Sequence, residues 1–72
     1  MNGKKLMELR QRAGLTRAEL SAKAGLGGPQ VSRIESGQRR GNSDTLRAIA
    51  DVLAAQLGED VGAVLKALTD PE

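Results

Sequence analysis

Residues 16–37 read TRAELSAKAGLGGPQVSRIESG, and this stretch decides the fold. Its first four residues have the pattern of a capping box, in which the Thr16 hydroxyl and the Glu19 carboxylate each accept a hydrogen bond from a backbone N–H. We therefore expect a helix to begin at Arg17. Gly25 stands only eight residues further on, and glycine is the residue that most readily ends a helix in the left-handed conformation. The predicted helix is therefore short.

A second short helix is predicted to follow this turn. Gly27-Gly28-Pro29 opens it, because proline is tolerated in the first turn of a helix, where its missing N–H costs nothing. Val31 and Ile34 are expected to point inward, and Gly37 ends the helix. Two short helices joined by a tight glycine turn can place one helix in the major groove of DNA while the other lies across the backbone. The stretch therefore predicts a helix-turn-helix unit.

Three further helices are predicted around this unit. Residues 4–13 carry apolar side chains at the helical spacing i, i+3 and i+7, namely Leu6, Leu9 and Ala13. After a polar connector, Asn42 or Ser43 can cap a helix with an apolar face, and Gly58 breaks it. That face consists of Leu46, Ile49, Ala50, Leu53 and Leu57. The last helix follows Glu59 and Asp60 and carries Val61, Val64, Leu65 and Leu68. The predicted fold class is all-α, one domain over residues 1–69 with a frayed tail at 70–72.

Length and composition limit the function classes. A chain of 72 residues is expected to bury only about 60% of its unfolded surface, so help from a partner subunit is expected. The sequence contains no cysteine and no histidine, and neither a metal site nor any other cofactor is expected. Without a glycine-rich phosphate loop or a carboxylate pair in an evident cleft, we expect no enzyme.

The nature of the partner is also limited by composition. Phe, Trp and Tyr are all absent, so bases cannot stack on aromatic platforms, as they do in many proteins that bind single strands or RNA. Duplex DNA is therefore the expected nucleic acid. No apolar run approaches the roughly 18 residues of a membrane span, and residues 1–15 lack the apolar core of a secretory signal. We expect no membrane partner and a cytoplasmic location.

The charge is distributed unevenly along the chain. Residues 1–40 carry nine cations against three acids, a net charge of +6, whereas residues 41–72 carry two cations and six acids, a net charge of −4. This asymmetry indicates one half that faces a polyanion and one that faces something else. The alternative is a charged surface that is merely solvated.

With these motifs the chain resembles the lambda-repressor-like family of phage repressors, Cro proteins and their bacterial relatives, the Cro/Xre type. The sequence segments that match are LMELR at 6–10, GLT at 14–16, AGL at 24–26, VSRIESG at 31–37, and Thr45-Leu46 with Ile49-Ala50. The resemblance covers residues 3 to about 57. It implies a compact five-helix DNA-binding domain whose second and third helices form the helix-turn-helix.

The resemblance also implies a role for each DNA-facing residue. Arg17 sits where the family usually has Gln and is expected to contact a phosphate, where arginine can form a charge-assisted bond. Thr16, which precedes it, is a further expected DNA contact. The groove-facing positions are held by Gly27, Gly28, Pro29, Gln30 and Arg33. Relatives often present long polar side chains where this chain has Gly28 and Pro29, so fewer base contacts are expected from the first turn.

Three polar residues of the third helix remain as candidates for DNA contacts, namely Gln30, Ser32 and Arg33. Arg33 is the main candidate for direct readout, because arginine bidentate to guanine is the commonest specific contact. The alternative is that Arg33 is only solvated or bound to phosphate. Specificity can also rest on the shape of the DNA.

Two further groups of residues take their expected roles from the family. Arg39 and Arg40 lie in the connector that contacts the sugar-phosphate backbone, and Ser36 and Asn42 are further candidates for donating to phosphates. Arg10 and Glu35 are expected to form an ion pair between the first helix and the end of the third. Its role would be positioning rather than net stability, since desolvation offsets much of the attraction. The alternative is a pair of solvated charges.

The apolar stripe of the last helix indicates self-association. Val61, Val64, Leu65 and Leu68 exceed what so small a core needs, so part of the stripe is expected to meet its copy across a two-fold axis. The alternative is that the stripe simply closes the monomer core. A homodimer would present two recognition helices about 34 Å apart and bind an inverted-repeat operator.

We therefore expect a sequence-specific transcription regulator, a repressor that acts as a homodimer. A protein-interaction role is the serious alternative, because antitoxins of toxin-antitoxin pairs and controllers of restriction-modification genes share this domain. A membrane-surface module is the remaining alternative, since residues 4–13 are basic and amphipathic, but this helix lacks aromatic anchors. The genes that neighbour this one would discriminate between a repressor and an antitoxin.

Overall fold

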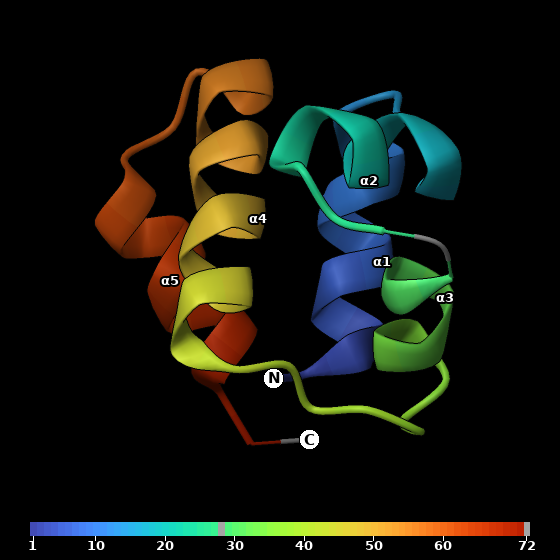
Figure 1. Cartoon of the computed structure of the whole chain (residues 1–72). Helices are drawn as coiled ribbons and strands as arrows, with labels where there is room; N and C mark the ends of the chain where they lie inside the picture. Colours follow the sequence, from blue (N-terminus) through green and yellow to red (C-terminus); the bar gives the residue numbers. More distant parts are fainter. Residues whose placement is uncertain (28, 72) are drawn as a thin grey trace.

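The computed structural model describes residues 1–27 and 29–71, and this part of the chain is all-helical (Figure 1). The helices are α1 (Gly3–Arg12), α2 (Arg17–Ala24), α3 (Gln30–Glu35), α4 (Ser43–Leu57) and α5 (Val61–Thr69). The described residues form five helices and no strand, which confirms the predicted fold class. None of these helices has the length and apolar character that would be needed to cross a bilayer.

Local sequence signals set the ends of the helices. Both bonds of the capping box are present at the start of α2: the Glu19 N–H donates to Thr16 Oγ1 over 3.0 Å, and the Thr16 N–H donates to Glu19 Oε1 over 2.9 Å. Gly25, with φ of 69°, ends α2 in the left-handed conformation that glycine adopts without strain. Asn42 is the cap of α4, since its Oδ1 accepts from the N–H of Thr45 over 2.8 Å. The choice between Asn42 and Ser43 is thereby settled.

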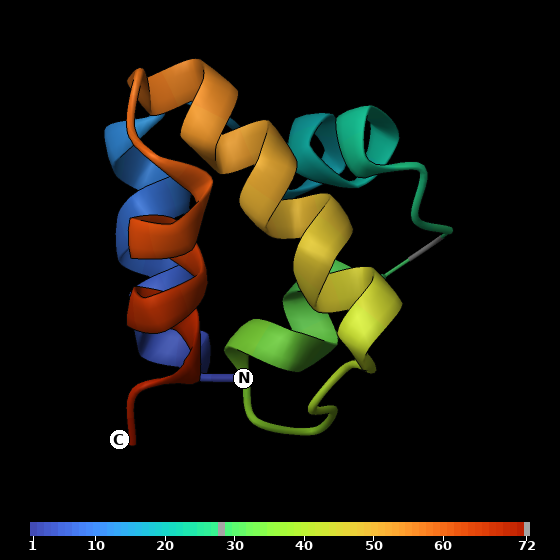
Figure 2. The ribbon, with the colours of Figure 1, turned by 90° about the vertical axis from the view of Figure 1, so that its left-hand side faces the viewer.

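The core draws at least one fully buried side chain from every helix. Leu6 of α1, Leu20 of α2, Ile34 of α3, Leu53 of α4 and Leu68 of α5 are all completely or almost completely buried. Helix α4 is the longest and packs against both α2 and α5. Figure 2 shows α4 running obliquely between α5 and α2. The helix-turn-helix unit and α5 therefore lie on different sides of α4.

The start of α1 lies against the ends of two other helices. The N–H of Asn2 donates to the carbonyl oxygen of Leu68 over 2.7 Å. Next to it, the backbone of Gly3 approaches α3 so closely that a Cβ atom there would lie 2.5 Å from the Ile34 oxygen and 2.8 Å from the Glu35 oxygen. The first residues of the chain and the end of α5 consequently lie at the same end of the molecule, as α3 does (Figure 1).

The apolar stripe of α5 is divided between the core and the surface. Val64 is 1% exposed and Leu68 is 0% exposed within the monomer, whereas Val61 and Leu65 are half-buried. The expectation that all four side chains exceed the needs of the core is therefore wrong for Val64 and Leu68. These two residues belong to the core, in a helix that packs against α4 and α1, and they have no surface left for a second chain.

Candidate nucleic-acid interface

The α2-turn-α3 unit holds a very short helix on the surface. Leu26, just after the turn, donates its N–H to the carbonyl oxygen of Ser21 over 2.8 Å, and Ser21 itself is buried. Val31 and Ile34 anchor α3 in the core, whereas Arg33 is exposed. A helix of six residues is marginal on its own, so packing against α1 and α2 must hold it.

The start of α3 differs slightly from the prediction. The helix begins at Gln30, so that Pro29 stands at the capping position before the helix instead of inside its first turn, and no side chain caps it. Gly27 and Pro29 are exposed, and Gln30 and Ser32 are half-buried. Gly28, which the sequence places among the groove-facing positions, lies outside the described residues. The long exposed side chain of α3 is therefore that of Arg33.

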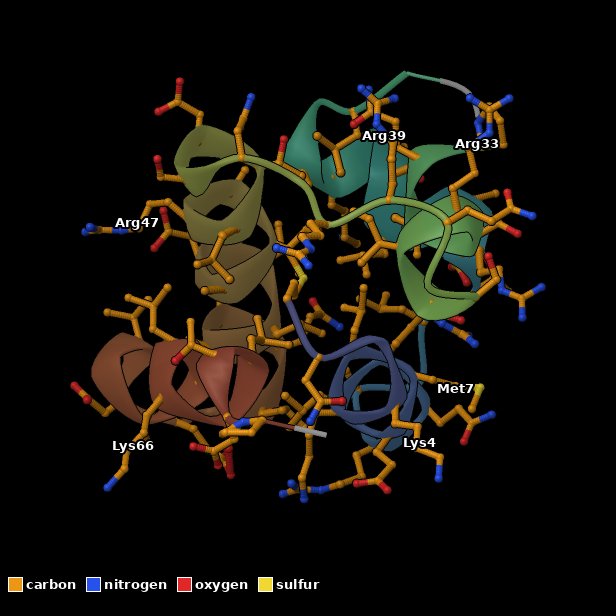
Figure 3. The ribbon with its side chains drawn as sticks, turned by 90° about the horizontal axis from the view of Figure 1, so that it is seen from below. Lys4, Met7, Arg33, Arg39, Arg47 and Lys66 are labelled. Carbon is orange, nitrogen blue, oxygen red and sulfur yellow. The ribbon has the colours of Figure 1, made fainter. Side chains whose placement is uncertain are left out.

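Exposed arginines gather on the side of the molecule that carries α3. In Figure 3 the side chains of Arg33 and Arg39 extend to the same side, whereas Arg47 and Lys66 point away from it. Arg40 follows in the exposed connector between α3 and α4. Within residues 1–27 and 29–71, no carboxylate forms an ion pair with any of these three connector and α3 arginines. Their charges are thus available to a polyanion.

Other cations of the surface are partly neutralised. Arg12 pairs with Glu59 over 3.2 Å, and Arg47 pairs with Asp51 over 3.5 Å along α4. Lys5 lies 3.6 Å from Glu8, one turn further along α1. These exposed pairs contribute little to stability, but they reduce the positive charge of the faces away from α3.

Three residues proposed from the sequence as polar contacts to DNA have local bonds. The hydroxyl of Ser36 donates to the carbonyl oxygen of Arg33 over 3.0 Å, so that in this rotamer it can accept a hydrogen bond but not donate one to a phosphate. The Thr16 hydroxyl and the Asn42 side-chain oxygen accept the capping bonds of α2 and α4. Among the described residues, no acceptor binds the hydroxyl proton of Thr16 or the amide protons of Asn42, so these protons can be donated to another molecule.

Arg10 and Glu35 form an ion pair between α1 and the end of α3. The Nε atom of Arg10 lies 2.7 Å from Glu35 Oε2, and its Nη2 atom lies 3.3 Å from Glu35 Oε1. The Nη1 atom donates to the carbonyl oxygen of Leu15 over 2.8 Å, and Arg10 is buried. This pair connects α1, the α1–α2 turn and α3, as its expected positioning role requires.

A third side chain joins this pair. The Nε atom of Arg17, at the start of α2, donates to Glu35 Oε1 over 3.0 Å. Sequence reasoning assigned Arg17 to phosphate contact alone and missed this bond, because the two residues are separated by 17 others and only the fold brings them together. We refer to Arg10, Glu35 and Arg17 as the Arg-Glu-Arg network.

The capping box lowers the pKa of one carboxyl group. The pKa of the Glu19 carboxyl is lowered, first because the backbone N–H of Thr16 donates to its charged form, then through the Thr16 side chain and the charge of Lys23. The carboxylate is fully exposed. Its hydrogen bond stabilises the start of α2, the helix that packs against α3.

Comparison with known proteins agrees with this geometry. The family described as "Helix-turn-helix domain" matches residues 3–68, which is nearly the whole chain and includes all five helices up to the last turn of α5. No curated protein and no solved structure matches the chain. The match is consistent with the resemblance to Cro/Xre-type proteins, and such domains bind DNA. On the strength of the glycine-ended α2, the exposed α3 and this match, the chain belongs to the helix-turn-helix domain family.

Proposed function

We propose that this protein is a sequence-specific transcription regulator of the cytoplasm, a repressor that binds duplex DNA as a homodimer. The observation that carries the proposal is the exposed helix α3, which packs against α1 and α2, with Arg33 and Arg39 extending to the same side (Figure 3) and forming no ion pair within the described residues. A helix presented in this way can enter the major groove. The lack of aromatic side chains argues against single-strand binding by base stacking.

The proposal divides the work among the arginines. Arg33 reads a base, since it is the exposed long side chain of α3 and arginine is suited to the two acceptors of guanine. Arg17, Arg39 and Arg40 bind phosphates, which adds affinity without sequence information. Gly27 and Pro29 present no long side chain, so they let α3 approach closely and leave part of the specificity to DNA shape.

The homodimer would form through the side that carries α5. Val61 and Leu65 are the half-buried residues that α5 retains for a partner, while Val64 and Leu68 hold the helix in its own core. Helix α5 lies on the other side of α4 from the helix-turn-helix unit (Figure 2). A two-fold contact there leaves both copies of α3 free, and an inverted repeat with half-sites about 34 Å apart would match them.

Selection from a random pool of duplexes tests the proposal. The expected outcome is enrichment of an inverted repeat with half-sites one helical turn apart. Titration of the selected duplex at several salt concentrations should give a logarithmic slope of about −0.9 per neutralised phosphate. Failure of the protein to retain any duplex at low ionic strength would contradict DNA binding, and enrichment of single half-sites would contradict the homodimer alone.

A further inference from the structure

The Arg-Glu-Arg network holds a buried carboxylate between a buried and an exposed arginine. The Glu35 side chain is 3% exposed, and the structure gives its carboxylate three N–H donors, two from Arg10 and one from Arg17. A carboxylate buried to this degree needs compensation by charge and by hydrogen bonds. The network supplies both.

The two arginines use their guanidinium groups differently. Arg10 engages Nε, Nη1 and Nη2 within the protein. Arg17 engages Nε with Glu35, and its side chain is 54% exposed. Within the described residues, no protein acceptor bonds the two Nη groups of Arg17. Arg17 is therefore held by Nε, and together with Arg10 and Thr16 it lines an open hollow on the surface.

The charge balance of the network favours an anion beside Arg17. A lone arginine-glutamate pair is neutral, and its carboxylate would repel a phosphate. Here Arg10 compensates the carboxylate from inside, so the network as a whole retains one positive charge, which lies on its exposed member. Glu35 can thus hold Arg17 without cancelling its attraction for an anion.

We propose that Glu35 is a positioning residue for duplex binding, which holds Arg17 by Nε so that its two Nη groups form a bidentate contact with a backbone phosphate, while Arg10 neutralises the carboxylate. This inference rests on the proposed function. Holding the long side chain in place before binding reduces the rotamer freedom that is lost when the phosphate is bound. It also gives Glu35 a part in DNA affinity, although the residue itself carries a negative charge.

The test replaces Arg17 by lysine, which keeps the charge but has no Nε and no planar fork. Arg17→Lys should bind the selected duplex about fivefold more weakly than the wild type, with the same salt slope, because the number of neutralised phosphates is unchanged. The matched control is Arg39→Lys, an exposed arginine without an ion pair in the described part of the chain. The affinity of Arg39→Lys for the selected duplex should stay within about twofold of that of the wild type. Equal affinities of Arg17→Lys and the wild type would overturn the inference.

A second measurement works on the free protein. The Nε–H of Arg17, detected by nitrogen-15 NMR, should exchange with water several-fold more slowly than that of Arg39, because Arg17 donates its Nε–H to Glu35 whereas Arg39 has no carboxylate partner within the described residues. Equal exchange rates would overturn the positioning role. If the wild type retains no duplex at all, the proposed function fails and this inference falls with it. If the wild type binds the duplex and Arg17→Lys binds it with equal affinity, the inference alone fails.

Discussion

The backbone N–H of Asn2 and the carbonyl oxygen of Leu68 form a 2.7 Å hydrogen bond that closes the chain between its second residue and the end of α5. The side chain of Asn2 strengthens this closure. Its Oδ1 accepts from the N–H of Lys5 and so caps α1, while its Nδ2 donates to the carbonyl oxygen of Asp70 over 3.2 Å. One residue thus fixes both the start of the first helix and the end of the last.

Replacement of Asn2 by alanine should therefore lower the free energy of unfolding by about 1 to 2 kcal/mol, since a cap and a second hydrogen bond are both lost. Asn42→Ala is the matched control, because the side chain of Asn42 caps α4 through Thr45 and makes no other bond within the described residues. We expect a loss near the lower end of that range for the control. Urea unfolding of both variants measures the difference, and equal losses would contradict the role of the Asp70 bond.

Gly3→Ala should destabilise the fold by about 1 to 3 kcal/mol, since the new Cβ would overlap backbone oxygens that cannot rotate away. The affected oxygens belong to Ile34 and Glu35. Gly62→Ala is the control in α5, where a Cβ would meet only the side chain of Asp60, whose Oδ2 caps α5 by accepting from the N–H of Ala63 but can shift, unlike a backbone oxygen. Alanine also gains up to about 1 kcal/mol in helix propensity over glycine. The free energy of unfolding of this variant should therefore be no more than about 0.5 kcal/mol below that of the wild type. Thermal unfolding of both variants measures the difference. A Gly3→Ala variant as stable as Gly62→Ala would contradict the close contact between Gly3 and α3.

Arg33→Ala and Arg17→Ala should affect duplex binding in different ways. Loss of Arg33 should relax base preference at one position of each half-site, at a cost of about 1 to 3 kcal/mol on the preferred sequence. Loss of Arg17 should weaken all sequences alike and reduce the magnitude of the salt slope by about 0.9 for each monomer. Binding of both variants to a panel of single-base operator variants separates the two effects, and identical profiles would show that this division of roles is wrong.

The capping box should make part of the stability depend on pH. The pKa of Glu19 is lowered in the folded protein by the hydrogen bond from the Thr16 N–H. Its stabilising contribution is therefore present above the unfolded-state pKa and is lost as the pH falls through the folded-state pKa. Glu19→Gln should lower Tm at neutral pH and have progressively less effect in acid. Glu8→Gln controls for the loss of one exposed carboxylate, and a constant difference between Glu19→Gln and wild type at every pH would exclude the linkage.

The local signals of the sequence were sufficient for most of the fold. Thr16 with Glu19, and the glycines at 25 and 58, act on the residues next to them, so the spacing of side chains along the chain already contains the required geometry. The start of α3 is not fixed by such a signal, because Pro29 restricts the backbone in the same way just before a helix as within its first turn.

The parts that the sequence did not reveal depend on contacts between distant segments. The division of the α5 stripe follows from how α5 packs against α4 and α1, and helical spacing cannot distinguish Val64 in the core from Val61 at its edge. The bond between Arg17 and Glu35 likewise requires the folded positions of α2 and α3. Asn2 did carry a local signal, since asparagine before a helix is a preferred cap.

The Arg-Glu-Arg network has a consequence for sequence divergence in this family. An arginine at position 17 places a second positive charge near the buried Arg10, and the carboxylate of Glu35 binds both. Lineages that carry arginine there should retain the glutamate at position 35, whereas lineages with an uncharged residue at 17 need that glutamate only for its pair with position 10. Amino acids at these three sites should therefore covary across related genes.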